Sequence, residues 1–167
     1  KAGDAVVIYA PRGNVTVKAA SKIGYTGIVG GLAKSGGHGI GASVSVLVVN
    51  NEILAQTGNG VTITAGKKIH VDADSKETIV AVVVNGAAAT GTNSGVAVAV
   101  SPSVNVIKGS TQAIAGTGTY KANTMDVTAD STTKIVILSG GAAVSTGKAG
   151  VGGSVQVDVF LKKVKAL

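Results

Sequence analysis

Two histidines, His38 and His70, are the only imidazole groups in a chain that contains no cysteine. A metal site needs three or four convergent ligands, drawn mainly from His, Cys and carboxylate side chains. Neither histidine has a cysteine or a suitably spaced carboxylate as a partner. The sequence therefore predicts a structural or surface role for both histidines, and no metal site.

The only acidic group in the sequence consists of Asp72, Asp74 and Glu77. Asp72 and Asp74 are two positions apart, so on a β-strand both carboxylates face the same side. Paired carboxylates could serve acid–base catalysis or bind calcium. We expect a solvated strand face instead, because the two other copies of the repeat described below do not keep the pair. The corresponding residues are Thr128 and Asp130 in one copy, and Lys18 and Ala20 in the other.

Glycine-rich segments are the third place where chemistry could occur, and 147–153 (GKAGVGG) has a composition suited to phosphate binding. A nucleotide-binding loop would need G-x-x-x-x-G-K-[ST] opening a helix. That motif is absent, and the related segment 36–41 (GGHGIG) indicates a recurring turn. Nucleophile elbows and Cys/His pairs are also missing. We therefore assign no catalytic, cofactor-binding or metal-binding residue and expect no enzyme activity.

These candidate residues belong to a segment that the chain contains three times, beginning near Thr16, His70 and Asp126. Equivalent positions are separated by 54 residues (71 minus 17) and 56 residues (127 minus 71). A repeat of this length is typical of arrays and solenoids. The aligned positions are Val17, Val71 and Val127; Ser21, Ser75 and Ser131; Gly31, Gly86 and Gly141; and Gly39, Gly95 and Gly150.

Alternation of apolar and polar residues indicates β-strands throughout, as in 14–19, and 78–89 is the longest such run. Turn signals at 11–13 and 58–60 separate the runs, and period-3.6 patterning is missing. We predict an all-β chain, a parallel β-solenoid (β-helix) of about three repeats of roughly 56 residues. Residues 1–167 form one solenoid segment, in which 161–167 depart from the repeat and could form a cap or a short helix.

Two paths are compatible with the sequence of one repeat. Fully extended, 56 residues would span about 185 Å, which favours two or three coils per repeat. The rival arrangement pairs 78–88 with 95–104 as an antiparallel hairpin through 89–94. Pro102 predicts a corner or an exposed edge, because proline cannot donate to a strand ladder.

Composition limits the other possibilities. The formal net charge is +7, but the lysines are scattered, with clusters only at 67–68 and 162–165. Scattered lysines on a β-rich surface favour solubility and edge protection, so we expect no specific nucleic-acid partner. We also expect no membrane insertion, because Asn85 and Gly86 interrupt the longest apolar run before about 20 residues. Few aromatic residues predict a thin core of small side chains.

Three phrases resemble the repeats of very large bacterial surface exoproteins: ADSTTKI (129–135), SGGAAVSTGKAGVGGSV (139–155) and GIGASVSVLVVNN (39–51). These are autotransporter adhesins and filamentous-haemagglutinin-like proteins of the fusobacterial type. The resemblance covers about 14–159. It implies a β-helical stalk within a passenger that carries binding sites away from the cell, with no catalytic motif. The chain starts in mid-strand, so we expect it to be a piece of a longer protein.

The resulting functional expectation is a stalk or passenger segment of a secreted or surface-displayed adhesin. Such a segment would mediate cell adhesion, contribute to virulence and be anchored in the outer membrane through its parent. Its partner would be a host or bacterial surface receptor or glycan, with possible end-to-end self-association and no cofactor. The alternatives are a self-assembling extracellular filament subunit and a polysaccharide-acting enzyme on a β-helix scaffold. A single arginine, Arg12, argues against the enzyme.

Overall fold

The chain is an all-β protein whose strands pair in parallel. The computed structural model describes residues 3–91 and 95–167, and within these residues every regular element is a strand. This confirms the all-β prediction. The strands are β1 (Val7–Ala10), β2 (Val15–Ser35), β3 (Gly39–Ala42), β4 (Ser45–Gln56), β5 (Val61–Ala65), β6 (Lys68–Ala89), β7 (Val96–Ile114), β8 (Gly118–Lys121), β9 (Thr124–Ser145) and β10 (Ala149–Ala166).

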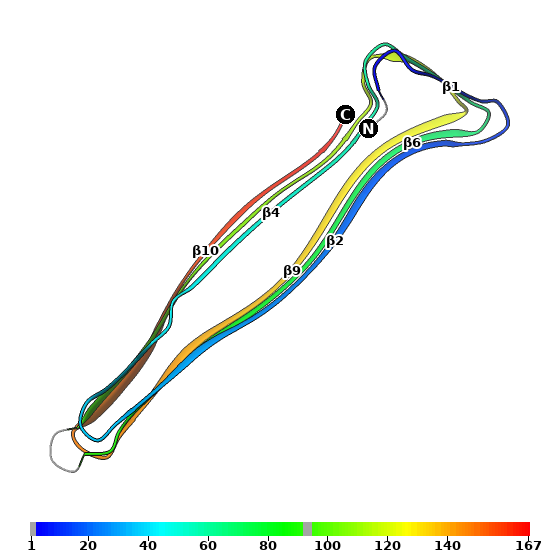
Figure 1. Cartoon of the computed structure of the whole chain (residues 1–167). Helices are drawn as coiled ribbons and strands as arrows, with labels where there is room; N and C mark the ends of the chain where they lie inside the picture. Colours follow the sequence, from blue (N-terminus) through cyan, green and yellow to red (C-terminus); the bar gives the residue numbers. More distant parts are fainter. Residues whose placement is uncertain (1–2, 92–94) are drawn as a thin grey trace.

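Two long sheets run side by side along the molecule, and a short third sheet lies at one end (Figure 1). The short sheet contains β1, β5 and β8; the β6 sheet contains β2, β6 and β9; and the β7 sheet contains β3 and β4, then β7, then β10. Short turns join the two long sheets directly at what we call the narrow end. At the opposite, wide end the short sheet lies between them (Figure 1).

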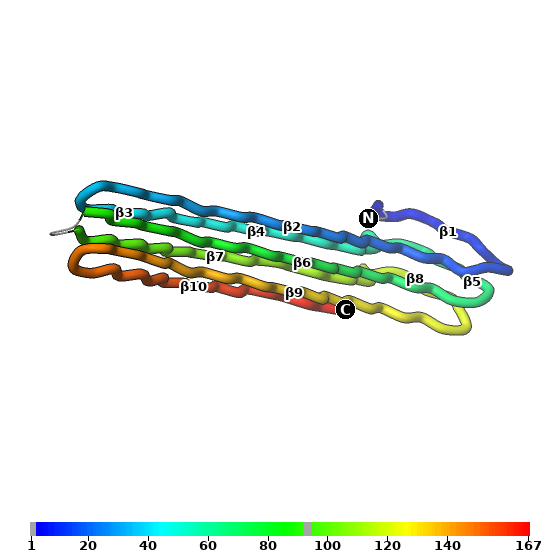
Figure 2. The backbone as a smooth tube through the Cα atoms, turned by 90° about the horizontal axis from the view of Figure 1, so that it is seen from below, coloured from blue at the N-terminus to red at the C-terminus, as the bar shows by residue number. Residues whose placement is uncertain are grey.

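Each sequence repeat makes one flat circuit, so the prediction of two or three coils per repeat is wrong. In the β6 sheet Val15 pairs with Ile69, a shift of 54 (69 minus 15), and Lys68 pairs with Thr124, a shift of 56. The estimate failed because it assumed a rounded coil. The two long sheets instead face one another over strands of about 70 Å, which accommodates the whole repeat in one turn. Figure 2 shows the successive circuits side by side.

The antiparallel hairpin is also wrong. Within the described residues β6 pairs only with β2 and β9, whereas β7 pairs with β3, β4 and β10, and every one of these ladders is parallel. β6 and β7 therefore lie in different sheets across the interior. Of the connecting loop 90–94, residues 92–94 lie outside the described residues.

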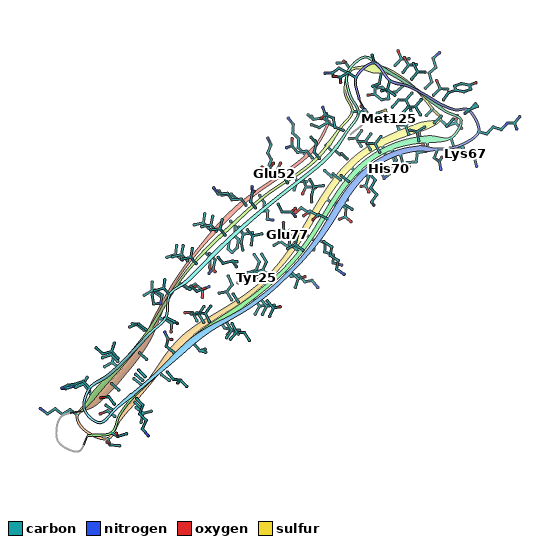
Figure 3. All side chains as sticks on the ribbon, viewed as in Figure 1. Tyr25, Glu52, Lys67, His70, Glu77 and Met125 are labelled. Carbon is teal, nitrogen blue, oxygen red and sulfur yellow. The ribbon has the colours of Figure 1, made fainter. Side chains whose placement is uncertain are left out.

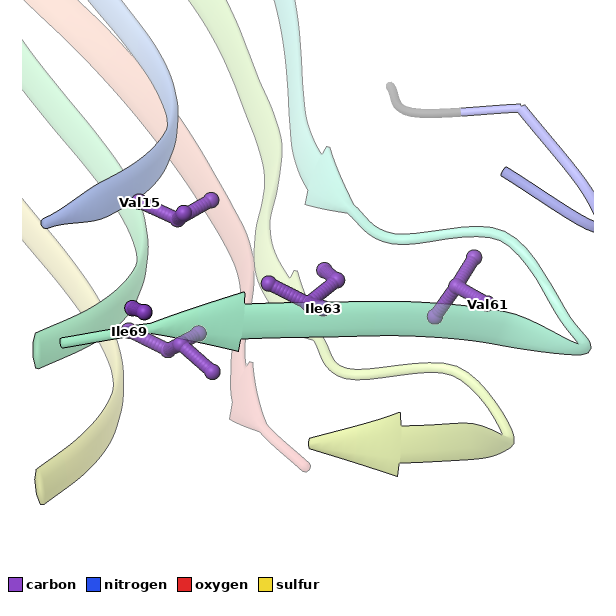
Figure 4. Packing of buried hydrophobic residues seen from close by; sticks show 5 residues of the cluster. Val15, Val61, Ile63 and Ile69 are labelled. Atoms are coloured by element: carbon purple, nitrogen blue, oxygen red, sulfur yellow. The ribbon is translucent and has the colours of Figure 1, made fainter. Parts of the chain in front are cut away.

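The core is divided along the length of the molecule. At the wide end Val15, Val61, Ile63 and Ile69 pack together between the sheets (Figure 4). Toward the narrow end the buried cluster consists of alanines alone, with Ala97 and Ala99 fully buried. The predicted thin core of small side chains is therefore confirmed at the narrow end, whereas the wide end holds larger aliphatic residues.

Pro102 is neither at a corner nor on an edge strand. It lies within β7, the strand between β3/β4 and β10, where it pairs with Val155. On the other side of β7, the strand is interrupted between Ala42 and Ser45. The Ser43 N–H donates to the Val100 carbonyl. Alternate residues of β7, which include Val100 and Pro102, therefore direct their backbone N–H and C=O groups toward this interruption. The missing N–H of Pro102 therefore faces a gap in the ladder, which explains its tolerance.

Two further predictions need correction. The segment 161–167 forms no helix: β10 continues to Ala166, which pairs with Ala113. Two glycines of the middle copy are also out of register, since Asn85 lies between Gly31 and Gly141, and Ala97 lies between Gly39 and Gly150. The valine and serine positions align as predicted. The turn at 58–60 is confirmed, with Gly60 at a φ of 67° that favours glycine.

Candidate functional site

One charged surface lies on the outer face of the β6 sheet. Asp72 and Asp74 both point outward, as predicted, but Asp72 is largely covered. Its carboxylate lies 2.7 Å from Lys18 Nζ and accepts a 2.8 Å hydrogen bond from Thr128. The hydrogen bond from Lys18 is the main reason that the pKa of Asp72 is below its ordinary value. Asp74 is exposed beside Asp130 in the register, so the solvated-face prediction holds for Asp74.

Glu77 is a separate case, and the prediction of a solvated face is wrong for it. An odd number of positions separates Glu77 from Asp72, so its side chain points to the opposite face of β6. It is fully buried between the two long sheets (Figure 3), whereas Glu52 of β4 is exposed. Asn51 donates to its Oε1 at 2.9 Å, Thr133 donates to its Oε2 at 3.1 Å, and Lys162 forms an ion pair with Oε2.

Lys162 reaches Glu77 across the interior from the third circuit. It pairs in register with Gly109 of the middle circuit. A Cβ at Gly109 would lie 2.7 Å from Lys162 Nζ and 3.0 Å from its Cδ, so the absence of a side chain leaves the space that the lysine occupies. The pair therefore connects β10 to β6 through three circuits: Asn51 from the first, Glu77 from the second, and Thr133 and Lys162 from the third.

The ionisation of Glu77 follows from these contacts. Burial raises the pKa of the carboxyl, because it disfavours the charged form. Hydrogen bonds from Lys162, Asn51 and Thr133, together with the positive charge of Lys162, outweigh burial and lower the pKa below its ordinary value. These donors favour the charged form of the carboxylate and connect the two long sheets through it.

A second polar network lies toward the narrow end in the β7 sheet. The Asn105 amide donates to Ser103 Oγ at 3.1 Å and to Asp158 Oδ1 at 2.7 Å, and Gln156 donates to Asp158 Oδ2 at 2.6 Å. Ser101 hydrogen-bonds to the Gly140 carbonyl across the interior. The interior is therefore polar in the middle of β7, between the alanine cluster and the cluster of Leu47, Ile79 and Ile107.

The glycine-rich segments lie at the narrow end. Residues 36–38 and 146–148 are turns between the two long sheets, and the Lys148 N–H donates to the Gly95 carbonyl. This supports the prediction that they are recurring turns of the repeat. His38 lies in the first of these turns and is exposed. His70 lies on the outer face of β6 near the wide end (Figure 3). It is in register with Asp126 of β9, and the Asp126 carboxylate forms a salt bridge with Lys68.

An open depression of about 510 Å³ lies on the β6 sheet. Glycine and aliphatic residues line it, and Leu32 lies over Gly86. The one amide, Asn85, donates its hydrogen bond to the Val100 carbonyl in the interior. With no charged or nucleophilic group, the depression offers apolar contact only. Its lining residues are Gly30, Gly31, Leu32, Val84, Asn85, Gly86 and Ala142.

Comparison with known proteins yields no match to any protein-family model, curated protein or solved structure. Among residues 3–91 and 95–167, no three His, Cys, Asp or Glu side chains are grouped so that they could hold a metal ion. The same residues contain no helix long and apolar enough to cross a membrane.

Sequence reasoning missed Lys162, which forms the buried ion pair with Glu77, and Asn51, which donates a hydrogen bond to the same carboxylate. The signal for Glu77 was present, because its parity along the strand differs from that of Asp72 and Asp74. Lys162 could not be found in this way. Which residue Lys162 faces across the interior depends on the register shift of the β7 sheet. That shift is 53 (149 minus 96) and differs from the 56 of the β6 sheet.

Proposed function

We propose that the chain is a parallel β-solenoid segment that acts as a rigid spacer within a secreted or surface-displayed bacterial adhesin. The observation that carries the proposal is the stacking of each repeat on the one before in all three sheets. Such stacking is additive, since each circuit contacts only its neighbours and the length grows with the number of repeats. A body of this kind separates a binding module from its anchor.

The arrangement of charge supports a spacer rather than an enzyme or a receptor-binding module. The charged residues of the β6 sheet pair with one another across strands, as Lys18 does with Asp72 and Lys68 with Asp126. Glu77 and Lys162 neutralise each other in the interior. The positive charge is thus distributed over the body, and we propose no catalytic role and no cofactor.

A glycan array probed at low and high salt tests this proposal, together with an assay for reducing ends released from polysaccharides. We expect weak binding to anionic glycans that is lost at high salt, because the Debye length falls from about 10 Å at 0.1 M to about 3 Å at 1 M. We expect no released reducing ends. Salt-resistant binding of one glycan would replace the spacer with a recognition module, and released ends would indicate an enzyme.

A filament subunit is the alternative function, and the open edges of the stack favour it. β2 and β9 are the outer strands of the β6 sheet, so each leaves one side of its backbone unpaired. Unpaired edges are templates for adding strands. Electron microscopy at high protein concentration distinguishes the two functions: a spacer stays a short particle, whereas a filament subunit elongates along the stacking direction.

A further inference from the structure

The outer face of the β7 sheet is apolar throughout its narrow half, in a region we call the valine face. Its residues alternate with the inward-facing ones and form continuous rows across the three circuits. They are Ile40, Ala42, Val44, Val46 and Val48; Val96, Val98, Val100, Pro102, Val104 and Val106; and Ala149, Val151, Gly153, Val155, Val157 and Val159.

The valine face is exposed, although the residues behind its middle part are polar. Val44 and Val46 are each 68% exposed, and Val104 on the middle strand is 39% exposed. Behind them Ser101, Ser103 and Asn105 are buried. A half-buried sheet normally places its apolar residues inward and its polar residues outward. The reversal here marks the outer face as one that another surface covers.

The size of the valine face suits a protein interface. Strands are about 4.8 Å apart and outward residues recur about every 6.7 Å, so each position occupies about 32 Å² and the whole face about 500 Å². Contiguous apolar patches of this size on monomers are often interaction sites. Two such faces in contact would bury about 1,000 Å² in total, the lower end of specific interfaces.

Flat faces of β-branched residues pack well against one another. Two sheets pack face to face at about 10 Å when their side chains interdigitate. The outer face of the β6 sheet is less suitable, because Leu32 is 94% exposed and protrudes beside glycines, and Lys34 follows it. The valine face therefore fits a second copy of itself better than it fits the other face.

A lipid bilayer fits less well, because β3, β4 and β10 are edge strands of the same sheet. Backbone groups without partners are costly in hydrocarbon. Face-to-face packing leaves both edges in water. Membrane interfaces also favour Trp and Tyr, whereas the valine face has neither.

The charges on the wide half of the β7 sheet determine the orientation of the two copies. Three lysines lie there on the same outer face as the valines: Lys108, Lys163 and Lys165. Copies aligned in the same direction would stack the two wide halves, each of which carries these three lysines against one outward glutamate, Glu52. Copies aligned in opposite directions overlap only at the narrow half, and their lysines point away from the contact. We propose that two copies of this chain pair through the valine face, with their strands running in opposite directions.

Sedimentation velocity of the whole chain, from about 1 µM to about 1 mM, tests the pairing, because weak interfaces dissociate in this range. We expect a monomer–dimer equilibrium. Val104→Lys places an unpaired charge in the contact and should weaken the dimer at least about tenfold. Gln112→Lys adds the same charge at an outward position of β7 beyond the valine face, and should change it by less than about twofold. Circular dichroism of both variants verifies that they fold.

Cysteine variants test the orientation, because the chain has no native cysteine. Val100→Cys lies near the centre of the valine face and should form disulfide-linked dimers on oxidation. Lys108→Cys has the same phase on β7 and should remain monomeric. Cross-linking of both variants would overturn the opposed orientation.

Three results would overturn the pairing itself. One is a monomer at every concentration, and another is a dimer that Val104→Lys leaves intact. The third is flotation of the wild type, but not of Val104→Lys, with phosphatidylcholine vesicles, which would assign the valine face to lipid. Each of these outcomes leaves the spacer proposal standing, since that proposal rests on the stacking of circuits.

Discussion

Replacement of Lys162 by methionine is the sharpest test of the interior. The variant keeps the aliphatic chain that fills the space over Gly109 but removes the charge that neutralises the fully buried Glu77. Removing one partner of a buried ion pair typically costs about 3–5 kcal/mol. We predict the lower end, about 3 kcal/mol at pH 7, because Asn51 and Thr133 still donate to the carboxylate. For a chain of this size that corresponds to a fall in Tm of about 6–12 °C.

The dependence on pH gives the prediction a second readout. In the wild type the folded-state pKa of Glu77 is lowered. Its stabilisation is therefore complete above the ordinary pKa of glutamate, about 4.3, and is lost as the pH falls through the lower folded-state pKa. In Lys162→Met the pKa of the buried carboxyl rises, and protonation then relieves the destabilisation. The difference in stability between the two proteins should shrink as the pH falls from 7 to 4.

Lys163→Met is the matched control. Lys163 is the next residue on β10 and has outward phase, so its removal changes the net charge equally without touching the interior. Thermal unfolding followed by circular dichroism measures all three proteins. Equal Tm values for Lys162→Met and Lys163→Met at pH 7, or a difference that persists unchanged at pH 4, would refute the role assigned to the ion pair.

Three more predictions concern packing and cations. Ala99→Leu should destabilise by about 1–3 kcal/mol, because Ala99 is fully buried, and an unchanged Tm would contradict the inward register. Gly109→Ala should lower the Tm because its Cβ meets Lys162, whereas Gly153→Ala, with nothing within 4 Å of its Cβ, should not; equal effects would contradict the packing over Gly109. A chelator should leave the far-UV circular dichroism spectrum unchanged, because the described residues offer no group of metal ligands; melting on chelation would reveal a missed site.

Local pattern was enough to predict strand type and repeat phase. The valine row of residues 17, 71 and 127 and the serine row of residues 21, 75 and 131 align in the structure as they do in sequence. Both rows lie in the β6 sheet, where the shifts of 54 and 56 are nearly equal. The glycine rows fail near the narrow end, where the loops differ in length and the β7 sheet has shifts of 58 (97 minus 39) and 53.

The buried site was harder to predict, because it depends on which residues of the two long sheets face each other across the interior. Parity places Glu77 inward, but nothing in the sequence states that Asn51, from a different sheet, lies opposite it. Gly109 gave no signal either, since its role is the space it leaves for a residue 53 positions later (162 minus 109). Such pairings follow from loop lengths at both ends of each circuit rather than from local pattern.

The placement of the termini has a mechanical consequence. The two ends of the described chain (3–167) lie at similar positions along the strands but on opposite sides of the stack (Figure 2). A load applied through them acts along the direction of the interstrand hydrogen bonds, so it peels an outer strand away one bond after another instead of shearing a whole ladder at once. Detaching one circuit of 55 residues (62 minus 7) frees about 180–200 Å of chain. Under tension the molecule would therefore lengthen in steps, dissipating force circuit by circuit.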